Sequence, residues 1–197
     1  MKVAKLPAGS GLADPGAPGW KNLAAETVAL SPVPLAAQPN AYIQEAWQGR
    51  DFGKTPEARV SAASDGAKLY VRVEWADDAR PHGEFQDAAG ALFPLNGGGA
   101  LATLGSSDSP VAVWFWENGR PAGLSLTSRG PGVFRREEGG SLGASGTLAD
   151  GKWAVVFSGP ANAAAKGKLG VAVWNGSNDE RAGLAAVSRD WLSLESD

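Results

Sequence analysis

The sequence contains no cysteine, one histidine and one methionine among its 197 residues. Without cysteine the chain has no disulfide, no thiolate nucleophile, no iron–sulfur ligand and no covalent c-type haem link. A single histidine, with no Gly-x-Ser-x-Gly elbow and no His/Glu cluster of the zinc type, leaves too few groups to assemble a hydrolase site. We therefore expect a protein that is not an enzyme by itself.

Positive charge and long apolar runs are also scarce. The formal net charge is -3 and the pI about 5.3, so nucleic acid and anionic membrane surfaces are poor partners. No run approaches the roughly 20 apolar residues that would cross a bilayer, and MKVAKLPAGSGLADPG lacks the apolar core of a signal peptide. We expect a periplasmic protein, exported with a partner or present in its mature form; the alternative is a cytoplasmic protein.

The abundant residues are 27 Gly, 13 Pro and 8 Trp, which favour many short elements over a few long helices. From Leu69 to Trp75 apolar and polar residues alternate, and Ala58, Val60 and Ala62 alternate in the same way. Ser64-Asp65-Gly66 between them can form a tight turn, so this segment predicts a β-hairpin. With further short strands, the pattern indicates an all-β fold, a mostly antiparallel β-sandwich with short helical turns.

Other strands are predicted wherever apolar runs end in Gly, Pro, Asn or Asp clusters. They span Ala88 to Phe93, Val111 to Glu117, Gly123 to Thr127, Trp153 to Phe157, Leu169 to Trp174 and Ala186 to Leu194. Prolines confine Thr27 to Leu35 to a sheet edge, and helical turns are expected near residues 40–48 and 161–166. Residues 1–22 are predicted as an extended arm that lies against a partner, and residues 23–197 as one sandwich domain.

Several segments are similar, in their order and spacing, to the haem b-binding gamma subunits of ethylbenzene dehydrogenase and dimethyl sulfide dehydrogenase-type molybdenum enzymes. They are DGAKLYVRVEWADDARP at 65–81, FQDAAGALFP at 85–94, LGSSDSPVAVWFW at 104–116, KWAVVF at 152–157 and GVAVWNGSNDERAGLAAVSRDWLSLE at 170–195. The resemblance implies a β-sandwich that takes electrons from a partner's iron–sulfur clusters through a b-type haem.

The same resemblance implies that a Met and a Lys coordinate the haem iron. At the matching positions this sequence has Leu104, followed by Gly105, and Ala185, with Leu184 and Ala186 as alternatives in register. Neither leucine nor alanine can coordinate iron. The chain is then a natural haem-less relative or an engineered variant, unless other residues replace the two ligands.

His82 and Lys168 are the first candidates for replacement ligands, because neutral imidazole and neutral amine groups can bind haem iron. A surface histidine in a loop and a solvated lysine at a strand entrance are the commoner situations. Nearby, Asp77, Asp78 and Asp87 are expected to form a solvated acidic turn rather than a calcium site, because their spacing fits no EF-hand loop.

The strand VAVWFW at 111–116 is apolar at every position, so both of its faces are expected to be covered. Trp114 and Trp116 share one face, where they form core or the wall of a binding pocket. The first hypothesis is a non-catalytic subunit that relays electrons or stabilises a complex with iron–sulfur and molybdenum-containing subunits. The alternative is a free-standing sandwich that binds a carbohydrate or another small ligand through these two tryptophans.

Overall fold

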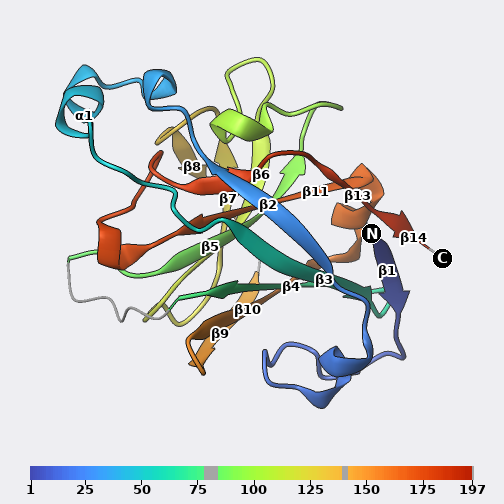
Figure 1. Ribbon diagram of the computed structural model, residues 1–197. Helices are drawn as coiled ribbons and strands as arrows, with labels where there is room; N and C mark the ends of the chain where they lie inside the picture. Colours follow the sequence, from blue (N-terminus) through green and yellow to red (C-terminus); the bar gives the residue numbers. More distant parts are fainter. Residues whose placement is uncertain (78–83, 139–141, 197) are drawn as a thin grey trace.

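The computed structural model describes residues 1–77, 84–138 and 142–196 of the chain as two packed sheets (Figure 1). The first sheet contains β1 (Lys2–Lys5), β2 (Glu26–Pro32), β3 (Glu57–Ser64), β4 (Lys68–Ala76), β9 (Gly143–Ala149), β10 (Lys152–Pro160) and β14 (Glu195–Ser196). The second contains β5 (Ala88–Pro94), β6 (Val111–Glu117), β7 (Leu124–Ser128), β8 (Phe134–Arg136), β11 (Lys168–Trp174), β12 (Ala186–Ser188) and β13 (Leu192–Ser193). The predicted all-β, mostly antiparallel sandwich is confirmed.

Strand β2 joins the two sheets. Residues 26–29 pair with β3, whereas Leu30 to Pro32 pair with β12, giving the continuous order β8-β7-β6-β5-β11-β12-β2-β3-β4-β10-β9. Each residue of β2 is paired with one neighbouring strand, so β2 is at the edge of each sheet, as predicted, and it also connects the two sheets. Pro32 is tolerated because it is the last residue of β2, and Pro34 lies beyond the strand.

The inner faces of the two sheets form the main core. Alternate residues of β4 and β10 meet alternate residues of β5, β6 and β11, as expected for strands that bury one face. The predicted hairpin is confirmed: β3 pairs antiparallel with β4, and Asp65 Oδ1 in the turn accepts hydrogen bonds from the N–H groups of Ala67 and Lys68 at 3.0 and 2.7 Å. The Lys68 bond is the main reason that the pKa of Asp65 lies below its usual value.

Residues 1–22 lie on the chain's own first sheet, not as a free extended arm. Strand β1 pairs in parallel with β3 and β14, which places the two ends of the chain side by side (Figure 1). Leu12 and Trp20 are buried against Tyr70 and Val156 on the outer face of that sheet. These two large apolar side chains attach a segment that is otherwise rich in Gly, Pro and Asp.

The predicted strand from Ala186 to Leu194 is split into β12 and β13, which both pair with β11. The split occurs next to Ser188, whose buried hydroxyl accepts from the Val171 N–H at 2.6 Å and donates to the Val171 carbonyl at 3.0 Å. A side chain therefore replaces main-chain ladder bonds at this point.

The helices are short, as the sequence predicts. They are α1 (Ala41–Ala46) and the 3-10 helices η1 (Pro18–Asn22), η2 (Leu35–Ala37), η3 (Leu101–Thr103), η4 (Ala161–Lys166) and η5 (Gly176–Asn178). Asn40 caps α1 by accepting a hydrogen bond from the Tyr42 N–H at 2.9 Å. Within the described ranges, none of the helices has the length and apolar character needed to span a membrane.

Candidate functional site

The outer face of the second sheet carries a second apolar core, which we call the outer cluster. It contains both Leu104 and Ala185, the two positions that the resemblance in the sequence suggested as ligand positions. The cluster consists of Val33, Ala88, Leu92, Leu101, Leu104, Val111, Val113, Ala172, Trp174, Ala185 and Val187. Val111, Val113 and Phe115 of β6 pack in or against it, while Ala112, Trp114 and Trp116 point into the main core. Both faces of the VAVWFW strand are therefore covered, as predicted.

Leu104 is held by a tight turn that ends η3. Its N–H donates to the Leu101 carbonyl at 2.9 Å, and its φ of 54° lies in the left-handed region. Gly105, with φ 98°, fits so closely that a β-carbon would lie 2.5 Å from the Ser128 carbonyl oxygen. The leucine side chain is fully buried, at 0% exposure, so it is an interior packing residue.

Ala185 is also fully buried, and its main chain is fixed from two sides. Its carbonyl accepts a hydrogen bond from the Val33 N–H at 2.9 Å. Gly53 packs so close that a β-carbon there would lie 2.8 Å from the same carbonyl and 2.7 Å from the α-carbon of Pro32. The Ala185 methyl group therefore faces a closed apolar environment.

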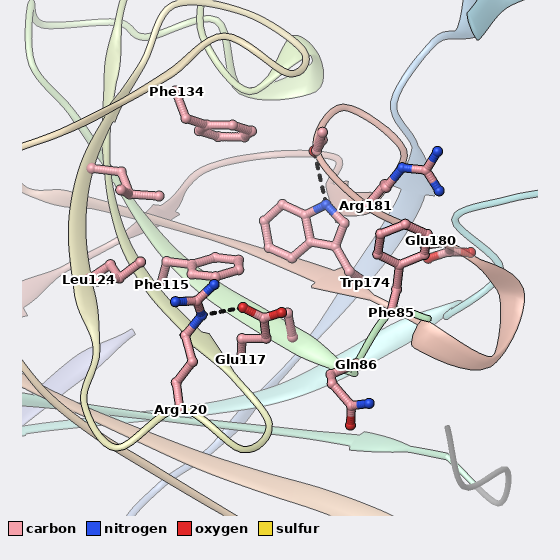
Figure 2. Close-up of a pocket in the computed structure, with 13 residues that line it drawn as sticks. Phe85, Gln86, Phe115, Glu117, Arg120, Leu124, Phe134, Trp174, Glu180 and Arg181 are labelled. Atoms are coloured by element: carbon pink, nitrogen blue, oxygen red, sulfur yellow. Dashed lines mark hydrogen bonds and ion pairs between the residues drawn. The ribbon is translucent and has the colours of Figure 1, made fainter. Parts of the chain in front are cut away.

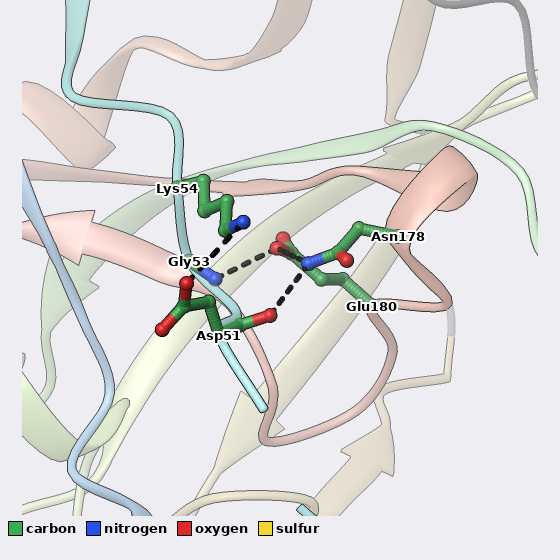
Figure 3. Close-up of polar contacts among 5 residues, drawn as sticks. All are labelled: Asp51, Gly53, Lys54, Asn178 and Glu180. Carbon is green, nitrogen blue, oxygen red and sulfur yellow. Dashed lines mark hydrogen bonds and ion pairs between the residues drawn. The ribbon is translucent and has the colours of Figure 1, made fainter. Parts of the chain in front are cut away.

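A buried carboxylate, Glu180, holds the loop before Ala185 in place (Figure 3). Its Oε1 accepts from the Gly53 N–H at 2.7 Å and from the Asn178 side-chain amide at 3.0 Å, and its Oε2 accepts from the Asn175 N–H at 2.9 Å. Glu180 is only 1% exposed, and burial raises its pKa although these hydrogen bonds oppose the shift. The carboxylate therefore serves to fasten residues 51–54 to residues 175–180.

A second buried carboxylate, Asp87, links the two sheets. It accepts from the indole N–H of Trp153 at 3.0 Å and from the Gly176 N–H at 2.9 Å, and burial raises its pKa. Asp77 is also buried and hydrogen bonded to Asp87. The expectation of a solvated turn was wrong for both residues, because these carboxylates join strand ends; Asp78 lies outside the described residues.

Trp114 and Trp116 point into the main core and are 6% and 3% exposed. Each indole lies on a glycine of the opposite sheet: a β-carbon on Gly159 would come within 2.4 Å of the Trp114 ring, and one on Gly146 within 2.3 Å of the Trp116 ring. The two rings therefore fill the space between the sheets. In these positions they offer no flat surface platform for a sugar.

Of the two candidate replacement ligands, the structure describes Lys168. Lys168 begins β11, on the same face as Trp174 but six residues away, which corresponds to roughly 20 Å along a strand. Its Nζ lies 3.5 Å from the Gly97 carbonyl oxygen and is directed there. His82 lies outside the described residues.

Beside the outer cluster is an open pocket of about 260 Å³ with mostly apolar walls (Figure 2). The rings of Phe115 and Trp174 meet edge to face, with their centres 5.5 Å apart, and form one corner of the pocket. Phe134 lies on the other side of the cavity. Polar side chains occur at its rim, where Arg120 is ion-paired with Glu117. This pocket was not predicted from the sequence, because its aromatic residues come from four separate segments.

Fold and site together define a class: a β-sandwich with a closed apolar cluster and an open apolar pocket on one sheet face. No group of three or more His, Cys, Asp or Glu side chains suited to a metal ion occurs in residues 1–77, 84–138 and 142–196. The chain matches no family model. In overall fold it is similar to a Bacteroides uniformis "putative carbohydrate-binding protein", with a TM-score of 0.51 and 11% identity over 100% of this chain and 98% of the other; this likeness concerns the fold alone.

Three curated proteins are related in sequence. A Haloferax mediterranei protein named "putative respiratory nitrate reductase heme subunit ORF7" is 32% identical over 68% of this chain and 53% of its own length. The chlorate reductase subunit gamma of Ideonella dechloratans is 31% identical over 71% of this chain and 65% of its own length. The dimethylsulfide dehydrogenase subunit gamma of Rhodovulum sulfidophilum is 27% identical over 73% and 62%.

The chain is therefore a homologue of the gamma subunits of molybdenum enzymes, as the resemblance in the sequence indicated. It matches between about half and two thirds of the length of these relatives. The relatives are named as haem or gamma subunits of reductase and dehydrogenase complexes, as the expectation of an accessory subunit requires.

Haem, which the Haloferax name implies for the family, does not fit the residues found here. Leu104 and Ala185 carry no donor atom for iron. Around the neighbouring pocket the polar side chains are carboxylates, guanidiniums and one amide, and its lining includes no His, Met, Tyr or Lys from residues 1–77, 84–138 and 142–196. Of the two carboxylates, Glu117 is ion-paired and Glu180 is fully hydrogen bonded, so neither is a free ligand.

Sequence reasoning missed the two buried carboxylates that organise this region. Glu180 stands between Asp179 and Arg181, and Asp87 follows Gln86, so both have polar neighbours, which is typical of solvated acids. One signal for Asp87 is that it directly precedes the apolar strand β5; Glu180 has no such neighbour. Their partners are mostly main-chain N–H groups, which a sequence does not reveal.

Proposed function

We propose that this chain is a non-catalytic, structural subunit of a molybdenum oxidoreductase complex, in which packed side chains replace the family's haem. Its relationship to gamma subunits supports the accessory role. The observation that carries the structural, haem-free part is the burial of Leu104 and Ala185 at 0% exposure in one apolar cluster. Buried leucine and alanine side chains offer no donor atom for iron.

The partners in this proposal are an iron–sulfur subunit and a molybdenum-containing catalytic subunit. The chain would stabilise the assembly of these two subunits. For that role it needs a large contact surface, but no redox centre of its own. A periplasmic location belongs to the same proposal, since it follows from the sequence resemblance and the expected export with a partner. Cell fractionation would test that location.

The alternative function, a free-standing module that binds carbohydrate through Trp114 and Trp116, is less well supported. Both indoles are buried against glycines, so stacking on a sugar would require the two sheets to separate. The similarity to a carbohydrate-binding protein at 11% identity extends to the fold alone.

The test is purification of the native complex through this chain, followed by metal analysis. The proposal expects molybdenum and iron–sulfur iron to co-purify with the chain in constant ratio through size-exclusion chromatography. Elution of the chain alone as a monomer, without molybdenum or iron in the same fraction, would refute the accessory role.

A further inference from the structure

The pocket beside the outer cluster has the shape of a slot for a flat group. Phe115 and Phe134 lie on opposite sides of the cavity, and Trp174 stands at its edge (Figure 2). All three side chains are held by strands, β6, β8 and β11, so the slot is largely preformed. Aromatic rings pack well in offset-stacked or edge-to-face arrangements, so an aromatic ring system suits this lining better than a branched aliphatic one.

The rim of the slot carries one cation that is not neutralised. The charge of Arg120 is balanced by its ion pair with Glu117. The Arg181 guanidinium lies 4.1 Å from the centre of the Phe85 ring and has no carboxylate within ion-pair distance in the described part of the chain. The adjacent Glu180 is turned inward to its own hydrogen-bond donors, as Figure 3 shows.

Arg181 is therefore suited to an acidic group on the ligand. Its planar guanidinium can donate two parallel hydrogen bonds to a carboxylate. Stacking against the Phe85 ring orients the Arg181 guanidinium plane, and the Arg181 side chain stays exposed at the pocket rim. The volume of about 260 Å³ lies just below the usual range for small-molecule sites, which limits the ring system to about two or three fused rings.

We propose that this pocket binds a small, flat aromatic acid, with its rings between Phe115 and Phe134 and its carboxylate on Arg181. The ligand is much smaller than a porphyrin and needs no iron ligand. The site is independent of the proposed accessory role, because it is formed by the chain alone. Failure of either proposal leaves the other standing.

The test compares two probes by isothermal titration calorimetry on the full chain: naphthalene-2-carboxylate and its neutral amide, naphthalene-2-carboxamide. We expect saturable binding of both, with the carboxylate bound about ten-fold more tightly because of its charge-assisted bonds to Arg181. Arg181→Gln should remove this preference and leave binding of the amide within about two-fold. The matched control is Arg135→Gln, an exposed arginine on the opposite face of β8 from Phe134, which should change neither affinity.

A variant that fills the slot tests where the probes bind, separately from the effect of the Arg181 charge. Leu126→Trp places a large ring inside the pocket and should abolish binding of both probes. Should this variant fail to fold by circular dichroism, Phe134→Ala on the short edge strand β8 replaces it, and both probes should bind at least about five-fold more weakly. Three results would each overturn the proposal. They are no saturable binding to the wild type at about 1 mM probe, equal affinity for the acid and the amide, and unchanged binding in the folded slot variant.

Discussion

Replacing Leu104 by alanine should strongly destabilise the chain if this position is closed core. The leucine is at 0% exposure and belongs to the outer cluster. Substitutions of this kind cost about 2–5 kcal/mol, the larger values arising where neighbours cannot relax into the cavity. Relaxation is restricted here, because Gly105 fits against the Ser128 carbonyl and fixes the turn. We expect a loss of about 3 kcal/mol.

The assay is urea unfolding monitored by tryptophan fluorescence, with thermal unfolding as a second measure. For a chain of this length, about 3 kcal/mol corresponds to a decrease in Tm of roughly 6–12 °C. Leu104→Met, which nearly conserves volume, should cost less than about 1.5 kcal/mol. Val133→Ala, at a valine that is 46% exposed, is the control and should lie within about 0.5 kcal/mol of wild type.

A loss below about 1 kcal/mol for Leu104→Ala, with an intact fold, would refute the reasoning. It would mean that the leucine lines an open cavity that is normally filled by another group. That result would favour a bound ligand at the family's haem position.

Three further predictions concern the buried carboxylate, the inter-sheet packing and haem binding. Glu180→Gln should cost about 1–3 kcal/mol, because an amide NH₂ would face an N–H donor. Because the pKa of Glu180 is raised in the folded state, its contribution to stability is full below the ordinary pKa of 4.5 and is lost as the pH rises through the folded-state pKa. The loss of unfolding free energy caused by Glu180→Gln, measured by urea unfolding, should therefore be larger near pH 4.5 than near pH 7. The reverse order would contradict the raised pKa. Gly146→Ala should destabilise the folded chain by about 1–3 kcal/mol or more, since the new methyl group would lie 2.3 Å from the Trp116 ring. An unchanged Tm in thermal unfolding would show that this ring is not fixed between the sheets. Leu104→Met combined with Ala185→Lys should gain a low-spin haem spectrum on haemin titration, and a folded double variant without such a spectrum would show that these are not the ligand positions.

The regular part of the fold could be predicted from local patterns. The hairpin of β3 and β4, and strands β5, β6, β10 and β11, have alternating or continuous apolar residues bounded by turn residues. Strand β9, with the sequence GASGTLA, has neither feature, and its Gly146 leaves room for the Trp116 ring of the other sheet. Such packing partners are far apart in sequence and leave no local signal.

The site could be predicted only in part, for a related reason. The resemblance identified Leu104 and Ala185 as the positions to compare, and the structure places both in the outer cluster. What surrounds them was not predictable: the Glu180 hydrogen bonds to residues 53, 175 and 178 depend on main-chain geometry, and the pocket depends on how β6, β8 and β11 align. The sequence shows which side chains stand at these positions, but which residues pack around them depends on tertiary contacts.

The central claim is that this gamma-subunit homologue has closed the haem position with its own side chains. The most direct measurement is the haem content of the chain, by pyridine haemochrome assay, after purification with its native partners and separation from them. The account predicts no haem b above background and no Soret band that shifts on dithionite reduction. About one equivalent of haem b per chain, with a Soret band that shifts on reduction, would contradict it.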